Sequence, residues 1–336
     1  MPKWWNPGAP CHGRKSSAVP VNLRHWLRFL GTLLAFSCLA WIAWRFHQEG
    51  VWQRVQGSSY AAELLRSTLF CIPLYCLGLC LLAVAWWCIQ SAFSARRLPF
   101  GPLFAIYAVT QFGKYLPGNV GQYVGRHVLS RKYDMSHAAL VLGTLAEAGF
   151  LLCASLVWAG SAINAALPAL QMQLAPWQLA LGIGLLLTAG VGAARLVARN
   201  NPKISRWLPV HSAAWLVPVW PLHLAFFGVM AYCFALTANV IEPAGIDPWL
   251  LAAAVATSWI AGFLVIGAPA GIGVREAVFV ALLGGHLPQS DLLVLAACFR
   301  VVTFGGDLLM FAVGILLGGN RGKATVAGEP KGPAAA

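Results

Sequence analysis

The sequence predicts an all-α polytopic membrane protein with about six transmembrane helices and two re-entrant broken helices in an inverted repeat. Of its 336 residues, 59% are hydrophobic and only 10% are charged, and the mean hydropathy is +0.70. Apolar stretches long enough to cross a bilayer recur along the chain, and two further apolar stretches are broken by proline and glycine. The charged residues between these stretches follow a pattern typical of membrane orientation.

The predicted membrane domain covers residues 23–318. Residues 1–22 are rich in Pro, Gly and Ser, and they are expected to form a disordered basic tail in the cytoplasm, as are residues 319–336. About 20 apolar residues in a helix cross a hydrocarbon core of ~30 Å. The segments that meet this requirement are Trp26–Phe46, Leu69–Ala92, His137–Asn164, Pro176–Ala194, Ala214–Asn239 and Ser290–Gly318.

Two further apolar segments are interrupted. The first breaks at Leu116-Pro117-Gly118 and the second at Ala268-Pro269-Ala270-Gly271, and a shorter helix is expected after each break. Hydrocarbon cannot satisfy the backbone groups that such a break leaves unpaired, so protein or a water-filled cavity must cover them. The similar order of elements around the breaks indicates an internal repeat, about residues 100–164 and about 249–318. The alternative is that Pro and Gly are simply common in membrane helices.

Basic residues indicate how the chain is oriented. They gather in segments 94–99, 131–136 and 195–206, whereas the loops 165–175 and 240–248 contain no Lys or Arg. By the positive-inside rule, both termini are expected on the cytoplasmic side of a bacterial inner membrane. Three spans separate the two broken segments, so these enter from opposite faces, an arrangement typical of transporters.

Each break would place the N-terminus of a short helix near the membrane centre, where its unpaired N–H groups favour an anion. Nearby basic side chains would strengthen this preference. The residues expected to bind a lipid head group are Lys114, Pro117, Gly118, Asn119, Gly121, Arg126, Pro269, Gly271, Gly273, Arg275 and Glu276. The alternatives are snorkelling to the interface for Lys114 and Arg126, and a local ion pair with Glu276 for Arg275.

Two opposite charges lie deep in long spans. Glu147 and Arg300 are each about ten residues into a span, which places them roughly 15 Å deep in a ~30 Å core. A lone charge there costs roughly 2.5–3.5 kcal/mol, so the two are expected to face one cavity as a pair or around a shared ligand. Asp307 lies on the same helical face as Arg300. It is expected to pair with Arg300 instead or to carry a coupling proton.

The remaining composition predicts neither a metal site nor a cofactor. None of the nine cysteines forms a CxxC pair, and none of the eight histidines forms an HxxxH or HExxH pair. The formal charge of +13 sits mostly in tails and turns, where it is an orientation signal. No nucleic-acid partner is therefore expected.

The segments Gly113–Gly121 with Arg126, and Pro269–Glu276, resemble motifs of a known family. They are similar to the membrane region of lysylphosphatidylglycerol synthases, a flippase-like domain that also occurs in stand-alone bacterial proteins. The resemblance covers about residues 20–320 and implies a role in moving lipid. Because only residues 319–336 follow the last span, we expect no soluble synthase domain and no synthase activity. The stand-alone members are associated with envelope-lipid pathways, including hopanoid and polyprenyl-linked glycan synthesis.

The first functional hypothesis is a lipid translocase. It would move a phospholipid or a polyprenyl- or hopanoid-type lipid with a phosphate-containing head group between leaflets. The alternatives are a membrane glycosyltransferase that uses a polyprenyl-phosphate sugar, and a non-catalytic membrane partner of a lipid-biosynthesis enzyme. The partners expected of the protein are its lipid, an envelope-lipid biosynthesis enzyme and a second copy of itself. No tight acidic motif is present in the predicted outer loops, so the transporter is favoured over the enzyme.

Overall fold

The computed structural model describes residues 59–116, 120–162, 211–243, 245–265 and 268–326, with isolated positions between 33 and 57 and between 178 and 200. This described part is mostly helical and contains no strand. The predicted all-α polytopic membrane fold is thus confirmed. The expected tail 1–22 lies outside the described residues, as do most of the expected spans Trp26–Phe46 and Pro176–Ala194.

Four helices among the described residues are long and apolar enough to cross a membrane. Their most apolar windows have mean hydropathies from 1.9 to 2.3. They correspond to four of the predicted spans. These helices are α3 (Ala61–Phe93), α6 (His137–Ala159), α10 (Val219–Ile241), which follows the short helix η5 (Ala213–Leu216), and α13 (Gln289–Val326).

The first broken segment forms a helical hairpin, called here the first hairpin. It consists of α4 (Phe100–Gln111), the short 3-10 helix η1 (Phe112–Tyr115) and α5 (Gly121–Ser130). The two arms pack closely because they meet through glycine. A Cβ atom added at Gly121 would lie 2.5 Å from the carbonyl oxygen of Gly113, so a larger residue would push the arms apart.

The second broken segment forms the second hairpin, from α11 (Pro248–Leu264), η6 (Pro269–Gly271) and α12 (Val274–Leu283). Asp247 caps α11 by accepting a hydrogen bond from the Trp249 N–H at 2.9 Å. The turn at the tip contains left-handed backbone at Ala270, Gly271 and Gly273 (φ 51°, 68° and 85°). Two of these three positions are glycine, which adopts this conformation without strain.

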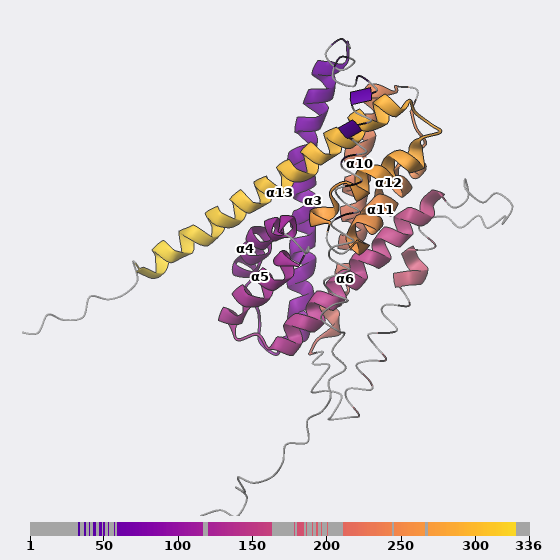
Figure 1. Ribbon diagram of the computed structural model, residues 1–336. Coiled ribbons are helices and arrows are strands. Elements are labelled where there is room, and N and C mark those ends of the chain that lie inside the picture. Colours follow the sequence, from indigo (N-terminus) through magenta and orange to yellow (C-terminus); the bar gives the residue numbers. More distant parts are fainter. Residues whose placement is uncertain are drawn as a thin grey trace, which may run out of the picture.

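The hairpins enter from opposite ends of α6 (Figure 1). The first hairpin leads into the start of α6 through the turn at 131–136. The second begins at the far end of α6, where the Ser161 hydroxyl donates to the Trp249 carbonyl at 2.9 Å. The 23 residues of α6 separate these ends by about 35 Å. Between them the two tips, η1 and η6, are in contact. That the hairpins are re-entrant halves of an inverted repeat stays a prediction.

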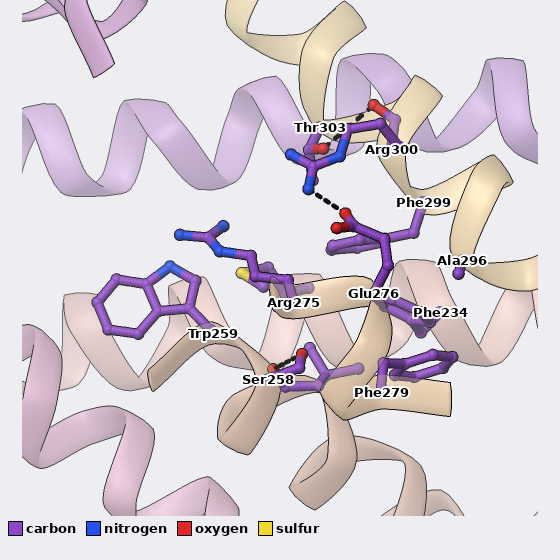
Figure 2. A pocket seen from close by; sticks show the side chains of 12 residues that line it. Phe234, Ser258, Trp259, Arg275, Glu276, Phe279, Ala296, Phe299, Arg300 and Thr303 are labelled. Atoms are coloured by element: carbon purple, nitrogen blue, oxygen red, sulfur yellow. Dashed lines mark hydrogen bonds and ion pairs between the residues drawn. The ribbon is translucent and has the colours of Figure 1, made fainter. Parts of the chain in front are cut away.

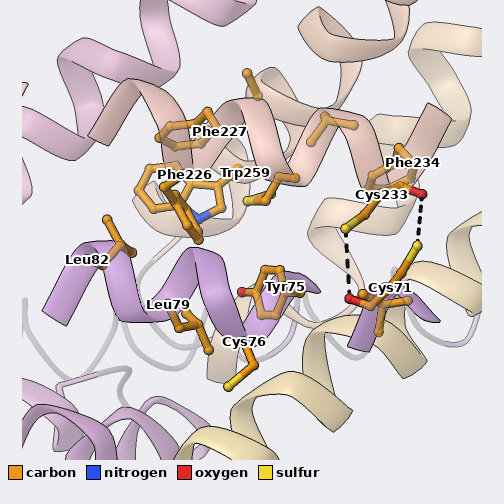
Figure 3. Packing of buried hydrophobic residues seen from close by; sticks show 14 of the residues in the cluster. Cys71, Tyr75, Cys76, Leu79, Leu82, Phe226, Phe227, Cys233, Phe234 and Trp259 are labelled. Atoms are coloured by element: carbon orange, nitrogen blue, oxygen red, sulfur yellow. Dashed lines mark hydrogen bonds between the residues drawn. The ribbon is translucent and has the colours of Figure 1, made fainter. Parts of the chain in front are cut away.

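The part of the core between α3 and α10 combines aliphatic, aromatic and sulfur-containing side chains (Figure 3). The Cys71 thiol donates to the Cys233 carbonyl at 3.6 Å, and the Cys233 thiol donates to the Cys71 carbonyl at 3.8 Å. One helical turn along α3 from Cys71, Tyr75 packs against Phe226. These cysteines therefore act as small packing residues.

Small residues bring α13 close to its neighbours. A Cβ atom at Gly306 would lie 2.5 Å from the Tyr75 ring of α3, and one at Gly314 would lie 2.8 Å from the Ala108 methyl of α4. Lipid tails are as apolar as the side chains themselves, so such close contact is what favours helix association in a membrane. This packing places the middle of α13 beside the first hairpin tip, η1, and beside α12 of the second hairpin.

Candidate functional site

Two cavities meet where the hairpin tips touch. The first cavity holds about 530 Å³ of empty space, part of it open to the outside, and is lined by polar residues of the first hairpin together with residues of the second hairpin, α3, α6 and α10. The second cavity holds about 360 Å³ and lies among α10, α11, α12 and α13 (Figure 2). Trp259 and Arg275 belong to the walls of both cavities.

A buried ion pair forms one wall of the first cavity. The Nη1 group of Arg126 on α5 donates to both carboxylate oxygens of Glu147 on α6 at 2.7 Å, and Nη2 donates to the Gln111 side-chain oxygen at 2.8 Å. Only 4% and 2% of the two charged side chains are exposed. The guanidinium also lies 3.7 Å from the centre of the Tyr107 ring. The charge of Arg126 is therefore compensated within the protein.

The second cavity contains a corresponding pair with its charges exchanged. Glu276, near the start of α12, forms an ion pair with Arg300 on α13 (Figure 2). Its other carboxylate oxygen accepts a hydrogen bond from the Gly273 N–H at 2.7 Å, which caps the helix. In the first pair the basic residue, Arg126, lies on the short helix α5. In the second pair the acidic residue, Glu276, lies on the short helix α12.

The expected pairing of Glu147 with Arg300 is wrong. They line different cavities, and each has its counter-charge on the short helix of its own repeat. The depth estimate gave their height but not the direction in which each side chain points. Each hairpin folds back beside the long helix that follows it, so Arg126 and Glu276 become the nearest partners. Because Arg126 is buried, its side chain does not extend to the membrane interface. The Glu276 carboxylate, which was the alternative partner expected for Arg275, is paired with Arg300 instead.

A third ion pair joins the two repeats. The Lys114 ammonium at the first tip lies 2.7 Å from both oxygens of Asp307 on α13, and the Tyr115 hydroxyl donates to Oδ2 at 2.6 Å. The Asp307 side chain is fully buried, and the Lys114 side chain is 14% exposed. Asp307 therefore pairs with Lys114, and its expected pairing with Arg300 is wrong.

Arg275 differs from these cations. Among the described residues it has neither an ion-pair partner nor a hydrogen-bond partner, and its Nε atom is buried. Its guanidinium lies 5.7 Å from the Trp259 ring. Glycines make room for the side chain, because a Cβ atom at Gly262 would lie 2.4 Å from its Cγ atom and one at Gly271 would lie 2.7 Å from Nε. The guanidinium is thus free to bind a ligand in either cavity.

The other predicted head-group residues are mostly backbone elements of the tips. Pro269, Gly271 and Gly273 form the turn of the second hairpin, and Gly121 provides the close approach within the first. Residues Pro117, Gly118 and Asn119 lie outside the described residues. Contact of any of these with a head group stays a prediction.

Several cavity residues were missed from the sequence. Trp259, Tyr107 and Tyr123 line the cavities, but they lie in or beside apolar segments where an aromatic residue gives no distinguishing signal. Gln111 could have been found, since it is a polar residue at the end of an apolar helix, immediately before the break. The proline and glycine breaks in the sequence indicated where the site lies, whereas the aromatic residues that line it could be identified only from the structure.

Comparison with known proteins places the chain in a family. No curated protein was found to match it. The family model described as the lysylphosphatidylglycerol synthase TM region matches residues 28–314, which is most of the chain and includes both hairpins. The chain therefore belongs to the lysylphosphatidylglycerol synthase transmembrane-region family and is a multi-pass membrane protein involved in lipid handling.

Proposed function

We propose that the protein moves a lipid with a negatively charged, phosphate-containing head group between the two leaflets of the membrane. The observation that carries this proposal is the unpaired guanidinium of Arg275, which faces two cavities at the contact of two helix breaks. A buried charge without a counter-ion is costly, so a ligand of opposite charge is favoured there. A guanidinium binds a phosphate through two parallel hydrogen bonds.

The lining of the first cavity suits such a head group. Lys114 and Arg126 are already neutralised by Asp307 and Glu147, so Arg275 leaves the site with one uncompensated positive charge. Amide and hydroxyl groups of Gln122 and the neighbouring tyrosines could hold the polar remainder of the head group.

The arrangement of the hairpins supports movement between leaflets. Transporters often place their substrate site where broken helices of an inverted repeat meet near the bilayer centre. Here both hairpins contribute to the first cavity, the second hairpin also lines the second cavity, and the hairpins enter from opposite ends of α6. A head group on Arg275 could pass from one cavity to the other while it remained bound to the same guanidinium.

We further infer that the membrane is the bacterial cytoplasmic membrane and that the start of α6 faces the cytoplasm. Arg96, Arg97, Arg131 and Lys132 lie near that end, and the connection before α11 carries acidic residues instead. This distribution follows the positive-inside rule.

The proposal is tested by reconstitution in liposomes that contain fluorescent phosphatidylglycerol. The wild-type protein should exchange the labelled lipid between leaflets, and Arg275→Gln should slow the exchange roughly ten- to a hundredfold, because one charged hydrogen-bonding partner is lost. Arg97→Gln removes an exposed cation and is the matched control. Wild-type exchange no faster than in protein-free liposomes would contradict the proposal. Sugar transfer from a polyprenyl-phosphate sugar without lipid exchange would favour the glycosyltransferase.

A further inference from the structure

We propose that Asp307 takes up a proton whenever an anionic head group binds, so that each lipid is moved together with a proton. This inference rests on the proposed function and adds its energy source. It is carried by the geometry of Lys114, which contacts Asp307 and the first cavity at the same time.

Asp307 depends on the first tip for its counter-charge. Its side chain is fully buried, and both carboxylate oxygens are engaged by Lys114 and Tyr115 at 2.6–2.7 Å. The carboxylate sits on α13, whereas both donors sit on η1. Its charge is therefore stabilised only while the tip of the first hairpin stays against α13.

A head-group phosphate competes with Asp307 for Lys114. The lysine lines the same cavity as Arg275, so an anion held by Arg275 attracts the ammonium away from the carboxylate. A buried carboxylate that loses its counter-ion becomes neutral by taking a proton, because the isolated charge is too costly. The Tyr115 hydroxyl can rotate to accept a hydrogen bond from the protonated carboxyl group.

Among the residues that the structure describes, the groups around Asp307 do not provide a competing acceptor for this proton. Tyr75 and Cys76 on α3 lie close enough to sense its charge, and both are ordinarily neutral. The helices α4 and α10 contain no acidic or basic residue apart from His223, which is buried beside Phe150. On α12, Arg275 is a cation and Glu276 is engaged by Arg300, the other charge on this part of α13.

The exchange balances in atoms and charge. Before binding, the lysine ammonium pairs with the aspartate; afterwards it pairs with the phosphate, and a proton taken from water is bound to an Asp307 oxygen. The lysine keeps its own proton and the phosphate keeps its charge. One singly charged head group and one proton thus move together, and no net charge crosses the membrane.

A pH gradient across reconstituted liposomes tests this coupling. With the membrane potential clamped, fluorescent phosphatidylglycerol should accumulate in the leaflet that faces the more alkaline side, by up to about tenfold per pH unit. Protein-free liposomes give the baseline. Asp307→Asn should abolish the protein-dependent accumulation, whereas Asp307→Glu, which keeps an ionisable carboxyl group, should preserve it. Asp134→Asn is the matched control at an exposed turn, because Asn tolerates the left-handed backbone there.

A measurement of proton uptake on lipid binding tests the proposal even for a variant that no longer exchanges lipid between leaflets. In weakly buffered detergent solution, the wild-type protein should take up roughly one proton per bound phosphatidylglycerol molecule, and Asp307→Asn close to none. Lipid exchange that ignores the pH gradient would overturn the coupling and leave the translocase intact. Binding without proton uptake would do the same. Absence of any exchange would overturn both proposals.

Discussion

The Lys114 ammonium lies 2.7 Å from the carboxylate of Asp307, although 193 positions separate the two residues in the sequence. Removing one partner of a buried ion pair leaves the other charge without compensation. Lys114→Met should therefore lower the free energy of unfolding by about 3 kcal/mol. The double variant with Asp307→Leu should recover part of this loss, as measured by unfolding in detergent. Strictly additive effects would show that the two residues do not interact.

Charge reversal should distinguish the two repeats. Arg126→Glu alone places two carboxylates together in the first cavity and should sharply reduce stability, whereas Arg126→Glu with Glu147→Arg restores opposite charges. The double variant Glu147→Arg with Arg300→Glu should not recover stability, because these residues have separate partners. Thermal unfolding midpoints of the purified variants measure both outcomes. Recovery by the Glu147–Arg300 exchange would contradict the observed pairing.

The glycine beneath Arg275 should be essential for lipid exchange. Gly262→Ala would place a methyl group 2.4 Å from the Arg275 Cγ atom, so the guanidinium must move. Overpacking of this kind costs about 1–3 kcal/mol. We expect slower leaflet exchange of fluorescent phosphatidylglycerol in liposomes. Gly285→Ala is the control, since a methyl group there meets nothing within 4 Å; equal rates for the two variants would argue against the role given to Arg275.

A pair of histidines should make stability depend on pH. His127 Nε2 lies 2.8 Å from His137 Nδ1, and burial, His137 and Arg131 together lower the pKa of His127. The folded protein thus binds this proton less readily than the unfolded chain, so stability is complete at neutral pH and falls as the pH drops below about 6.5. His127→Gln should flatten this fall in unfolding midpoints measured between pH 7.5 and pH 5.5. His286→Gln, at the opposite end of the protein, should leave it unchanged.

Much of the fold was predictable because lipid imposes constraints that are local in sequence. A helix must be long enough to cross the bilayer, and a break must be covered. The length of the apolar stretches therefore predicted the positions of α3, α6, α10 and α13, and the prolines and glycines predicted the positions of both hairpin tips.

The partners of the buried charges were not predictable in the same way. Residue spacing gave the depth of Glu147 and Arg300, but their pairing depends on how each long helix is rotated and which hairpin arm packs beside it. The tie between Lys114 and Asp307 depends on close packing of distant helices through residues such as Gly314. Such contacts between distant helices do not produce a repeating pattern in the sequence from which they could be predicted.

The link between the first tip and α13 has no counterpart in the other half of the described structure. The position that matches Asp307, seven residues after Glu147, is Ala154, whose methyl group cannot hold a lysine. The two hairpin tips are thus attached differently: an ion pair ties the first tip to α13, whereas Ala154 offers no charge for a matching tie at α6. A substitution that removes the Lys114–Asp307 pair therefore loosens one hairpin tip, and no equivalent substitution exists for the other.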